Sequence, residues 1–208
     1  AALLLALLVN MGLKGTNFFR TAYFAPVVTS MVVVSIVWTF LYHKDIGLIN
    51  EFLNSVSFGL IDKINWLGDP AWSMPAIVIM SAWQGAGYQM LIFLAGLQNI
   101  SEDLYEAASL DGANSWQKFV NVTLPGLRNT TIFVIISTTI AAFGLFTQVD
   151  VMTSGGPADS TTTVMYHAVR KGFREQDIGY GSTISVVYFL VILAIAMGQK
   201  YYFDKREK

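Results

Sequence analysis

Four long apolar runs constrain this chain more than any other feature of its sequence. They cover residues 21–42, 74–97, 129–149 and 182–203, and their central turns contain no Asp, Glu, Lys or Arg. At about 1.5 Å per residue, each run is long enough to cross about 30 Å of hydrocarbon as a helix. Only 13% of the residues are charged, against about 25% in an average soluble domain. The sequence therefore predicts an all-α membrane protein, a polytopic bundle of transmembrane helices.

The opening residues, AALLLALLVNMGL, are equally apolar but reach Lys14 after only 13 residues. A secretory signal peptide is one interpretation, but such a peptide begins with a basic stretch that is absent here. We expect instead the end of another span, whose beginning precedes the sequence. Residues 1–208 are then predicted to form a single transmembrane domain of five spans, the first of them truncated.

Lys and Arg are unevenly distributed among the predicted loops. If residues 14–20, the segment 98–128 and the C-terminus share one side, that side holds eight of the 13 basic residues. They are Lys14, Arg20, Lys118, Arg128, Lys200, Lys205, Arg206 and Lys208. The loops 43–73 and 150–181 hold the other five. By the positive-inside rule, segment 98–128 is predicted to be cytoplasmic and the two loops to lie on the opposite side.

Several classes of function find no support in the composition. The chain has no Cys and no H-E-x-x-H or G-x-S-x-G motif, and its two histidines, His43 and His167, fall in separate loops. Without a G-x-x-x-x-G-K-[ST] motif it cannot hydrolyse nucleotide by a P-loop of its own, so any active transport must be driven by another subunit. A net charge of −1 without a basic cluster gives no reason to expect nucleic acid. Ion-coupled carriers are disfavoured, because they usually keep an ionisable residue within the membrane.

The spans do contain uncharged polar residues. Ser81, Gln84 and Tyr88 follow i, i+3, i+7 spacing and are predicted to share a face of one helix. A second face is predicted to contain Thr131, Thr138, Ala141, Ala142, Leu145 and Gln148. Two such faces suit a path for a neutral, hydroxyl-rich solute. Ordinary packing between membrane helices uses the same residue types and is the alternative at each position. Tyr88 beside Gln84 favours the path most, because an aromatic plane and an amide suit a sugar ring.

Segment 98–128 is patterned like surface helices of a soluble protein. Ser101 is predicted to cap a helix over 102–111, Glu102 and Asp103 supply negative charge to its first turn, and Gly112 is expected at a left-handed position after its end. One face of this helix is predicted to contain Leu104, Ala107, Ala108 and Asp111, flanked on the other side by Glu106 and Leu110.

A second short helix is predicted to begin near Ser115, with an apolar face formed by Trp116, Phe119 and Val120. Pro125 is expected to end it and to open the next span. Such a helix pair suits docking into a groove of a soluble partner. The alternative, an amphipathic helix resting on lipid, is disfavoured by the weakly apolar face and the few Lys and Arg residues.

The stretch EAASLDGANSWQKFVNVTLPG closely resembles the EAA loop of the membrane-spanning subunits of binding-protein-dependent ABC importers. The matching residues are Glu106, Ala107, Ala108, Asp111, Gly112, Leu124 and Pro125. FFRTAYFAPVV, WTFLYHKDIGLINEFL and TSGGPADSTTTVMYHAV look like permease subunits for carbohydrate uptake, of the maltose-transporter first-permease type. The resemblance covers most of the chain and narrows the solute to sugars and related compounds such as glycerol phosphate.

The resemblance implies a permease core embedded in membrane lipid and paired with a second, similar permease. Two cytoplasmic ATPase subunits would bind ATP and magnesium, so no cofactor is expected in this chain, and a periplasmic or lipid-anchored protein would deliver the solute. Segment 98–128 would couple to the ATPase through Leu104, Glu106, Ala107, Ala108, Leu110, Asp111, Gly112 and Pro125. The SGGP turn at 154–157, on the periplasmic side, would face the binding protein.

The same resemblance implies where a sugar is held in the membrane. The corresponding positions are Gln84, Gly85, Tyr88, Thr138, Ala141, Ala142 and Leu145. Ala141, Ala142 and Leu145 depart from the maltose-type subunit, which has aromatic and amide side chains there. The predicted function is carbohydrate uptake across the bacterial inner membrane. The alternatives are a membrane scaffold or receptor that recruits a soluble partner without moving solute, and an importer for a non-sugar solute such as glycerol phosphate.

Overall fold

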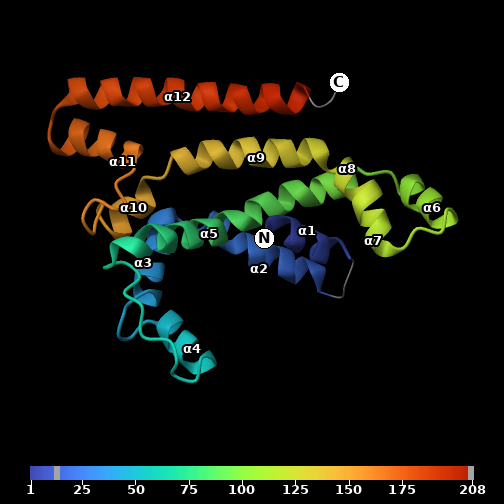
Figure 1. Cartoon of the computed structure of the whole chain (residues 1–208), viewed down its shortest axis with the longest axis horizontal. Coiled ribbons are helices and arrows are strands. Elements are labelled where there is room, and N and C mark those ends of the chain that lie inside the picture. Colours follow the sequence, from blue (N-terminus) through green and yellow to red (C-terminus); the bar gives the residue numbers. More distant parts are fainter. Residues whose placement is uncertain (12–14, 206–208) are drawn as a thin grey trace. The chain divides into compact units, whose positions relative to one another are not determined.

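The computed structural model describes residues 1–11 and 15–205, and over these residues it consists of helices joined by loops and turns (Figure 1). Two compact units are distinguished. The first unit comprises Ala1–Val27, Gly85–Thr139 and Ala196–Lys208, and the second comprises Val28–Gln84 and Ile140–Ile195. The α-helices are α1 (Ala2–Asn10), α2 (Thr16–Val28), α3 (Met31–Leu41), α4 (Leu48–Val56), α5 (Pro70–Gln98), α6 (Glu102–Leu110), α7 (Ser115–Lys118), α8 (Leu124–Gly126), α9 (Arg128–Phe143), α10 (Thr147–Met152), α11 (Val164–Val169) and α12 (Ile178–Lys205). Two π-helices, η1 (Phe119–Thr123) and η2 (Arg170–Arg174), follow α7 and α11.

Two of the predicted spans are single long helices. The run 74–97 lies within α5 and the run 182–203 lies within α12, and both helices are long and apolar enough to cross a membrane. The Asp69 carboxylate accepts the backbone N–H of Ala71 at 2.9 Å, which satisfies one of the free amides in the first turn of α5. These two spans were therefore predicted correctly from length and composition.

The predicted span 21–42 is not one helix, so the prediction of a single continuous helix over these residues was wrong. α2 ends at Val28 and α3 begins at Met31, with Ser30 in an extended conformation at φ −53° and ψ 131°. Pro26 lies in the last turn of α2, where it has no N–H for the carbonyl one turn earlier. The β-branched residues Val27, Val28 and Thr29 that follow are weak helix formers. Together α2 and α3 still qualify as a broken, bent pair of spanning length.

The predicted span 129–149 also stops early. α9 ends at Phe143, and the chain continues through Gly144 to α10, which begins at Thr147. The Leu145 carbonyl, released from the helix, accepts a hydrogen bond from Thr163 Oγ1 at 2.7 Å. Residues Ser115–Gly126 and α9 qualify together as a second bent pair, with 62° between them. The described residues thus hold two continuous candidate spans, or up to four if each bent pair counts as one.

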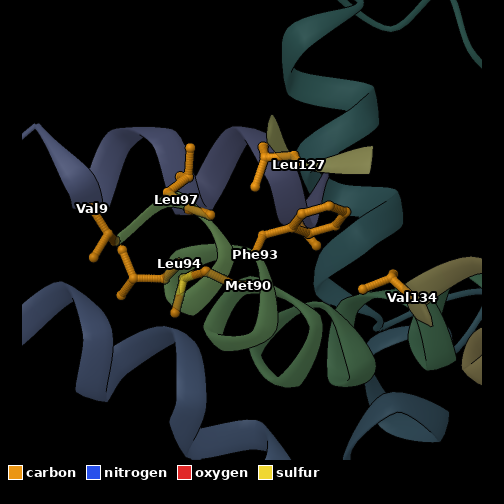
Figure 2. Packing of buried hydrophobic residues seen from close by; sticks show 9 residues of the cluster. Val9, Met90, Phe93, Leu94, Leu97, Leu127 and Val134 are labelled. Atoms are coloured by element: carbon orange, nitrogen blue, oxygen red, sulfur yellow. The ribbon is translucent and has the colours of Figure 1, made fainter. Parts of the chain in front are cut away.

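The core of the first unit forms around the second half of α5. Met90, Phe93, Leu94 and Leu97 follow i, i+3, i+4, i+7 spacing and are all buried. The remaining members of this cluster are Ala2, Ala6, Val9, Leu127 and Val134. Figure 2 shows Val9 of α1 against α5 in this cluster. The apolar opening residues are thus a helix that packs into a core.

The core of the second unit joins α3, α5 and α10. Its members are Val34, Tyr42, Trp66, Ala76, Ile77, Met80, Val149, Met152 and Tyr166. The Tyr42 hydroxyl donates to the Ala76 carbonyl at 3.0 Å. The buried Asn50 side chain donates to the carbonyls of Lys44 and Ile64 and accepts from Trp66 Nε1 at 3.0 Å. Residues 43–73, predicted only as a loop, therefore form an ordered segment that contains α4.

Candidate functional site

The helix predicted over 102–111 is α6, and its two ends are built by local signals. Ser101 Oγ accepts the Asp103 N–H at 3.3 Å, as predicted for an N-cap. At the other end Gly112 adopts φ +78°, the predicted left-handed position. Ala113 N–H then donates to the Ala108 carbonyl at 2.9 Å, and Gly112 N–H to the Ser109 carbonyl at 3.1 Å. This is the Schellman arrangement, which satisfies the last carbonyls of a helix.

The surface of α6 is exposed and acidic. None of its residues is buried, and Leu104 and Leu110 are 55% and 90% exposed. Its carboxylates and that of the C-cap belong to Glu102, Asp103, Glu106 and Asp111, and none of them forms an ion pair within residues 1–11 and 15–205. Leu104, Ala107 and Asp111 are exposed and Ala108 is half-buried. Among the described residues, the helix therefore presents a negative surface without ion pairs, which also exposes the side chains of Leu104 and Leu110.

The second helix begins at Ser115 as predicted, but it does not end where the sequence suggested. Asn114 and Gln117 form a reciprocal capping box at its start. α7 then widens into η1, where Leu124 N–H donates to the Phe119 carbonyl five residues earlier. Pro125 lies inside the following turn, α8, and the chain breaks only at Leu127, before α9. The expectation that Pro125 ends the helix and opens the next span was wrong, because η1 leads directly into α8 and the helix ends at Gly126, one residue after the proline.

Two side-chain hydrogen bonds join α6 to the helix that follows it. Tyr105 OH and Thr123 Oγ1 lie 3.0 Å apart, and Lys118 Nζ donates to Ser109 Oγ at 2.7 Å. Hollows of about 580 Å³ and 320 Å³ flank α6. The larger is lined by Asn10, Leu97, Gln98, Ile100, Glu102, Tyr105, Glu106 and Ser109, and the smaller by Ala108, Asp111, Gly112, Ala113, Gln117, Asn121 and Val122. Sequence reasoning missed Tyr105 and Thr123, because nothing in a pattern pairs hydroxyls 18 residues apart.

The residues predicted to line a solute path fall into both units. Gly85, Tyr88 and Thr138 belong to the first unit, and the other four predicted positions belong to the second: Gln84, Ala141, Ala142 and Leu145. Tyr88 is 54% exposed. Thr138 Oγ1 accepts a hydrogen bond from Gln89 Nε2 at 2.8 Å, which brings Gln89 to this group although the sequence did not single it out.

The second predicted polar face is not continuous. Because α9 ends at Phe143, Leu145 and Gln148 do not extend the face that carries Thr138. Gln148 is instead buried in α10. In the first predicted face, Ser81 Oγ donates to the Ile77 carbonyl of its own helix at 2.8 Å. Helical spacing therefore overstated the length of one polar face.

The SGGP stretch forms the predicted turn and is held by side chains. Ser154, Gly155, Ala158 and Asp159 all have φ between +50° and +86°. Tyr166 OH donates to the Ser154 carbonyl at 2.8 Å. Threonine hydroxyls hold the two neighbouring carbonyls: Thr162 Oγ1 donates to Gly155 O at 3.2 Å and Thr161 Oγ1 to Gly156 O at 2.8 Å. These bonds offset the cost of a left-handed backbone at residues other than glycine.

Charges near this turn are paired with one another. Arg174 Nη2 lies 2.6 Å from Asp150 Oδ1, and Arg170 and Lys171 both contact Glu175, at 3.3 and 2.5 Å. The hydrogen bond from Lys171 lowers the pKa of the Glu175 carboxyl below its usual range, and the charges of Lys171 and Arg170 act in the same direction.

Within the part of the chain that the structure describes, no cluster of three His, Asp or Glu residues could hold a metal ion.

The fold and this site define a polytopic helical membrane protein with a pair of surface helices between two of its candidate spans. Residues 1–208 match the family described as "Binding-protein-dependent transport system inner membrane component", and the chain belongs to this family. The family is one of transport components of the inner membrane, so the predicted fold class, family and localisation are confirmed.

Two curated relatives and one solved structure illustrate the match. The lactose transport system permease protein LacF of Rhizobium radiobacter is 37% identical over 205 residues, which cover 97% of this chain and 68% of LacF. The arabinooligosaccharides transport system permease protein AraP of Halalkalibacterium halodurans is 36% identical over 203 residues, covering 96% of this chain and 63% of AraP. This chain thus spans about two thirds of each relative. A bacterial ABC transporter that imports the acidic polysaccharide alginate shares the fold, with a TM-score of 0.86 at 22% identity, covering 100% of this chain and 72% of that one.

Proposed function

We propose that this chain is the permease subunit of an ABC importer that takes up a carbohydrate across the bacterial inner membrane, driven by a separate ATPase subunit. The observation that carries the proposal is α6 with its Gly112 turn, in a chain that matches the importer family from end to end. The chain itself contributes transport and no catalysis, and its sequence has no P-loop motif. ATP and magnesium belong to the ATPase subunit.

The charge on α6 supports docking to a protein over resting on lipid. The four carboxylates of α6 and its C-cap, which have no ion-pair partner among residues 1–11 and 15–205, would be repelled by an anionic lipid surface, which attracts Lys and Arg. A cleft with basic side chains on an ATPase would complement the same surface. The proposed coupling residues are Leu104, Glu106, Ala107, Ala108, Leu110, Asp111, Gly112 and Pro125.

The proposed orientation places segment 98–128 in the cytoplasm and residues 43–73 and 150–181 in the periplasm. The uneven distribution of Lys and Arg supports it. Of the basic residues that carry this argument, Lys14, Arg206 and Lys208 lie outside the described residues. In this orientation the turn at 154–157 faces the solute-binding protein, and the family description itself names dependence on such a protein.

A second, homologous permease and two ATPase subunits complete the proposed assembly. The exposed apolar side chains of α12 are consistent with contact to lipid or to a second permease, since Gly181 is its one buried residue among those described. Tyr88, Thr138, Gln84, Gly85, Ala142 and Leu145 are the proposed solute positions. The names of LacF and AraP favour a sugar or oligosaccharide as the solute.

Reconstitution tests this function. The chain, its partner permease and the ATPase are placed in proteoliposomes, and uptake of labelled oligosaccharides and of sn-glycerol 3-phosphate is measured with the loaded binding protein and ATP. ATP-dependent uptake of an oligosaccharide is expected. Uptake of glycerol phosphate alone would replace the carbohydrate assignment. Stable recruitment of a soluble partner without uptake of either solute would favour the scaffold or receptor alternative.

A further inference from the structure

α6 has few attachments to the rest of the first unit. No residue of this helix is buried, so apolar packing does little to fix its position. Among the described residues, two side-chain hydrogen bonds tie it to residues 115–126: Lys118 to Ser109 and Tyr105 to Thr123. The first joins exposed groups, where water competes for both partners.

The Tyr105–Thr123 bond differs in its surroundings. Thr123 is only 6% exposed, and Tyr105 is half-buried. The two hydroxyl oxygens are 3.0 Å apart, and either can donate. A hydrogen bond shielded from water holds its geometry better than one at the surface, because losing it leaves a buried hydroxyl without a partner. This is therefore the stiffer of the two links between α6 and the helix that follows.

Thr123 occupies the junction between the surface helices and the core. It is the last residue of η1, and its carbonyl accepts the Leu127 N–H at 2.9 Å. Leu127 is fully buried in the core of the first unit and directly precedes α9. A displacement of Thr123 is thus passed through one backbone hydrogen bond to the start of α9.

The segment between α7 and α9 is interrupted by two features that weaken a helix. The π-turn replaces the regular i→i−4 bonds over Phe119–Thr123, and Pro125 provides no N–H to the carbonyl one turn earlier. Backbone hydrogen bonding alone therefore leaves 119–126 easier to bend than an unbroken helix. A side-chain link from α6 to Thr123 bypasses α7 and most of the π-turn, and it enters this segment at the residue whose carbonyl accepts the Leu127 N–H.

We propose that the Tyr105–Thr123 hydrogen bond is the strut that transmits displacement of α6 to α9, and so makes these two residues positioning residues for coupled transport. The proposal rests on the proposed function of α6 as the element that docks to the ATPase. Tyr105 and Thr123 touch neither solute nor nucleotide in this scheme. They determine how much of the movement of α6 reaches a span.

Hydroxyl deletions in the reconstituted transporter test the strut. Tyr105→Phe and Thr123→Val each remove the bond and keep the shape of the side chain, and the double variant is compared with both. We expect solute taken up per ATP hydrolysed to fall by about three- to tenfold, the factor that corresponds to one shielded hydrogen bond. The double variant should be no worse than either single one, because both remove the same bond. Thr123→Ser should restore uptake per ATP, since it keeps a hydroxyl.

Matched controls delete hydroxyls that do not connect α6 to α9. Thr39 Oγ1 donates to the Ser35 carbonyl within α3 at 2.9 Å, so Thr39→Val serves for Thr123→Val. Tyr201 is exposed on α12, so Tyr201→Phe serves for Tyr105→Phe. Both controls should keep wild-type uptake per ATP.

Three outcomes would overturn the strut. The first is unchanged uptake per ATP in Tyr105→Phe and Thr123→Val, and the second is additive losses in the double variant. The third is a parallel loss of membrane abundance or of ATPase association, which would indicate a role in folding. Failure of the proposed function itself looks different, because then the wild-type complex shows no ATP-dependent uptake. A transporting wild type that loses coupling in Gly112→Val but not in Tyr105→Phe would retain the docking role of α6 and exclude the strut.

Discussion

The segments 98–128 and 150–181 both interrupt long helices with short ones and both contain a π-turn, yet they treat their charges in opposite ways. In the first, the carboxylates of α6 and its C-cap have no ion-pair partner within the described residues. In the second, Arg170, Lys171 and Arg174 are each paired with a carboxylate of the same segment. The charges of segment 98–128 are therefore available to another molecule, whereas those of segment 150–181 stabilise the segment itself.

The backbone conformations of the two segments also differ, and so do the groups that hold them. The ends of α6 rely on caps within a few residues, and Gly112 provides the single left-handed position, with open space around it. The turn at 154–159 contains four left-handed residues, held by hydroxyls of Thr161, Thr162 and Tyr166. We infer that the first segment is shaped to dock through exposed charge and the second to present a rigid surface.

The largest effect is expected when the two segments are labelled from outside the cell. Single cysteines at Ser109 and Ala158, both exposed, are introduced into this cysteine-free chain. An impermeant thiol reagent on intact cells should label position 158 and not position 109, and permeabilised cells should label both. The reverse pattern would overturn the proposed orientation and the docking argument with it.

Gly112→Val should produce the next largest loss, in ATPase association and in coupling of hydrolysis to uptake. A left-handed backbone costs a residue with a β-carbon about 1–2 kcal/mol, and for a β-branched residue the turn re-forms at another angle, which redirects α7. Because no atom lies within 4 Å of an added Cβ, backbone conformation alone is tested. Gly112→Asn, which tolerates this region, should be milder. Equal losses in both variants would contradict the conformational explanation.

Glu106→Ala should weaken ATPase association by about fivefold, since one exposed charge pair contributes about 1 kcal/mol. Titration of labelled ATPase onto permease in nanodiscs measures it. Glu106→Gln should behave like Glu106→Ala if charge is responsible, and added salt should reduce the difference from wild type. A loss confined to Glu106→Ala and insensitive to salt would point to packing instead.

Tyr88→Ala tests the proposed solute path independently of segments 98–128 and 150–181. Removal of an exposed aromatic plane should lower the uptake rate by about five- to tenfold if a sugar stacks on it, with ATPase association and membrane abundance unchanged. Tyr88→Phe, which keeps the plane, is the matched control. Parallel losses of abundance and uptake would show instead that Tyr88 packs against a neighbouring helix.

The smallest effect is expected at Arg174. Arg174→Ala removes the pair with Asp150 and the guanidinium 5.9 Å from the centre of the Tyr166 ring. Partly exposed ion pairs contribute about 1 kcal/mol or less, so affinity for the solute-binding protein should fall by no more than about fivefold. Surface plasmon resonance on reconstituted permease measures it. A loss as large as that of Gly112→Val would mean that segment 150–181 also binds through its charge.

Local rules predicted α6 well because its structure depends on neighbours in sequence. Ser101, Gly112 and the start at Ser115 follow from capping chemistry within three or four residues. The same rules failed at Pro125, which lies in α8 directly after the π-turn that ends at Thr123, the residue whose hydroxyl is bound by Tyr105. They also failed at Leu145, whose carbonyl is satisfied by Thr163, 18 residues later.

The sequence by itself determined the membrane fold class, the spans over α5 and α12, the capped ends of α6 and the family. Length, apolarity and capping are properties of short stretches, so they can be read without coordinates. Only the tertiary structure decided where the span 129–149 breaks, which hydroxyls pair across α6 and η1, and that Arg170, Lys171 and Arg174 pair with carboxylates of their own segment. Those features depend on backbone and side-chain groups that are distant in sequence and meet only in the folded chain. Buried carbonyls and hydroxyls need hydrogen-bond partners, and only the fold decides which groups supply them.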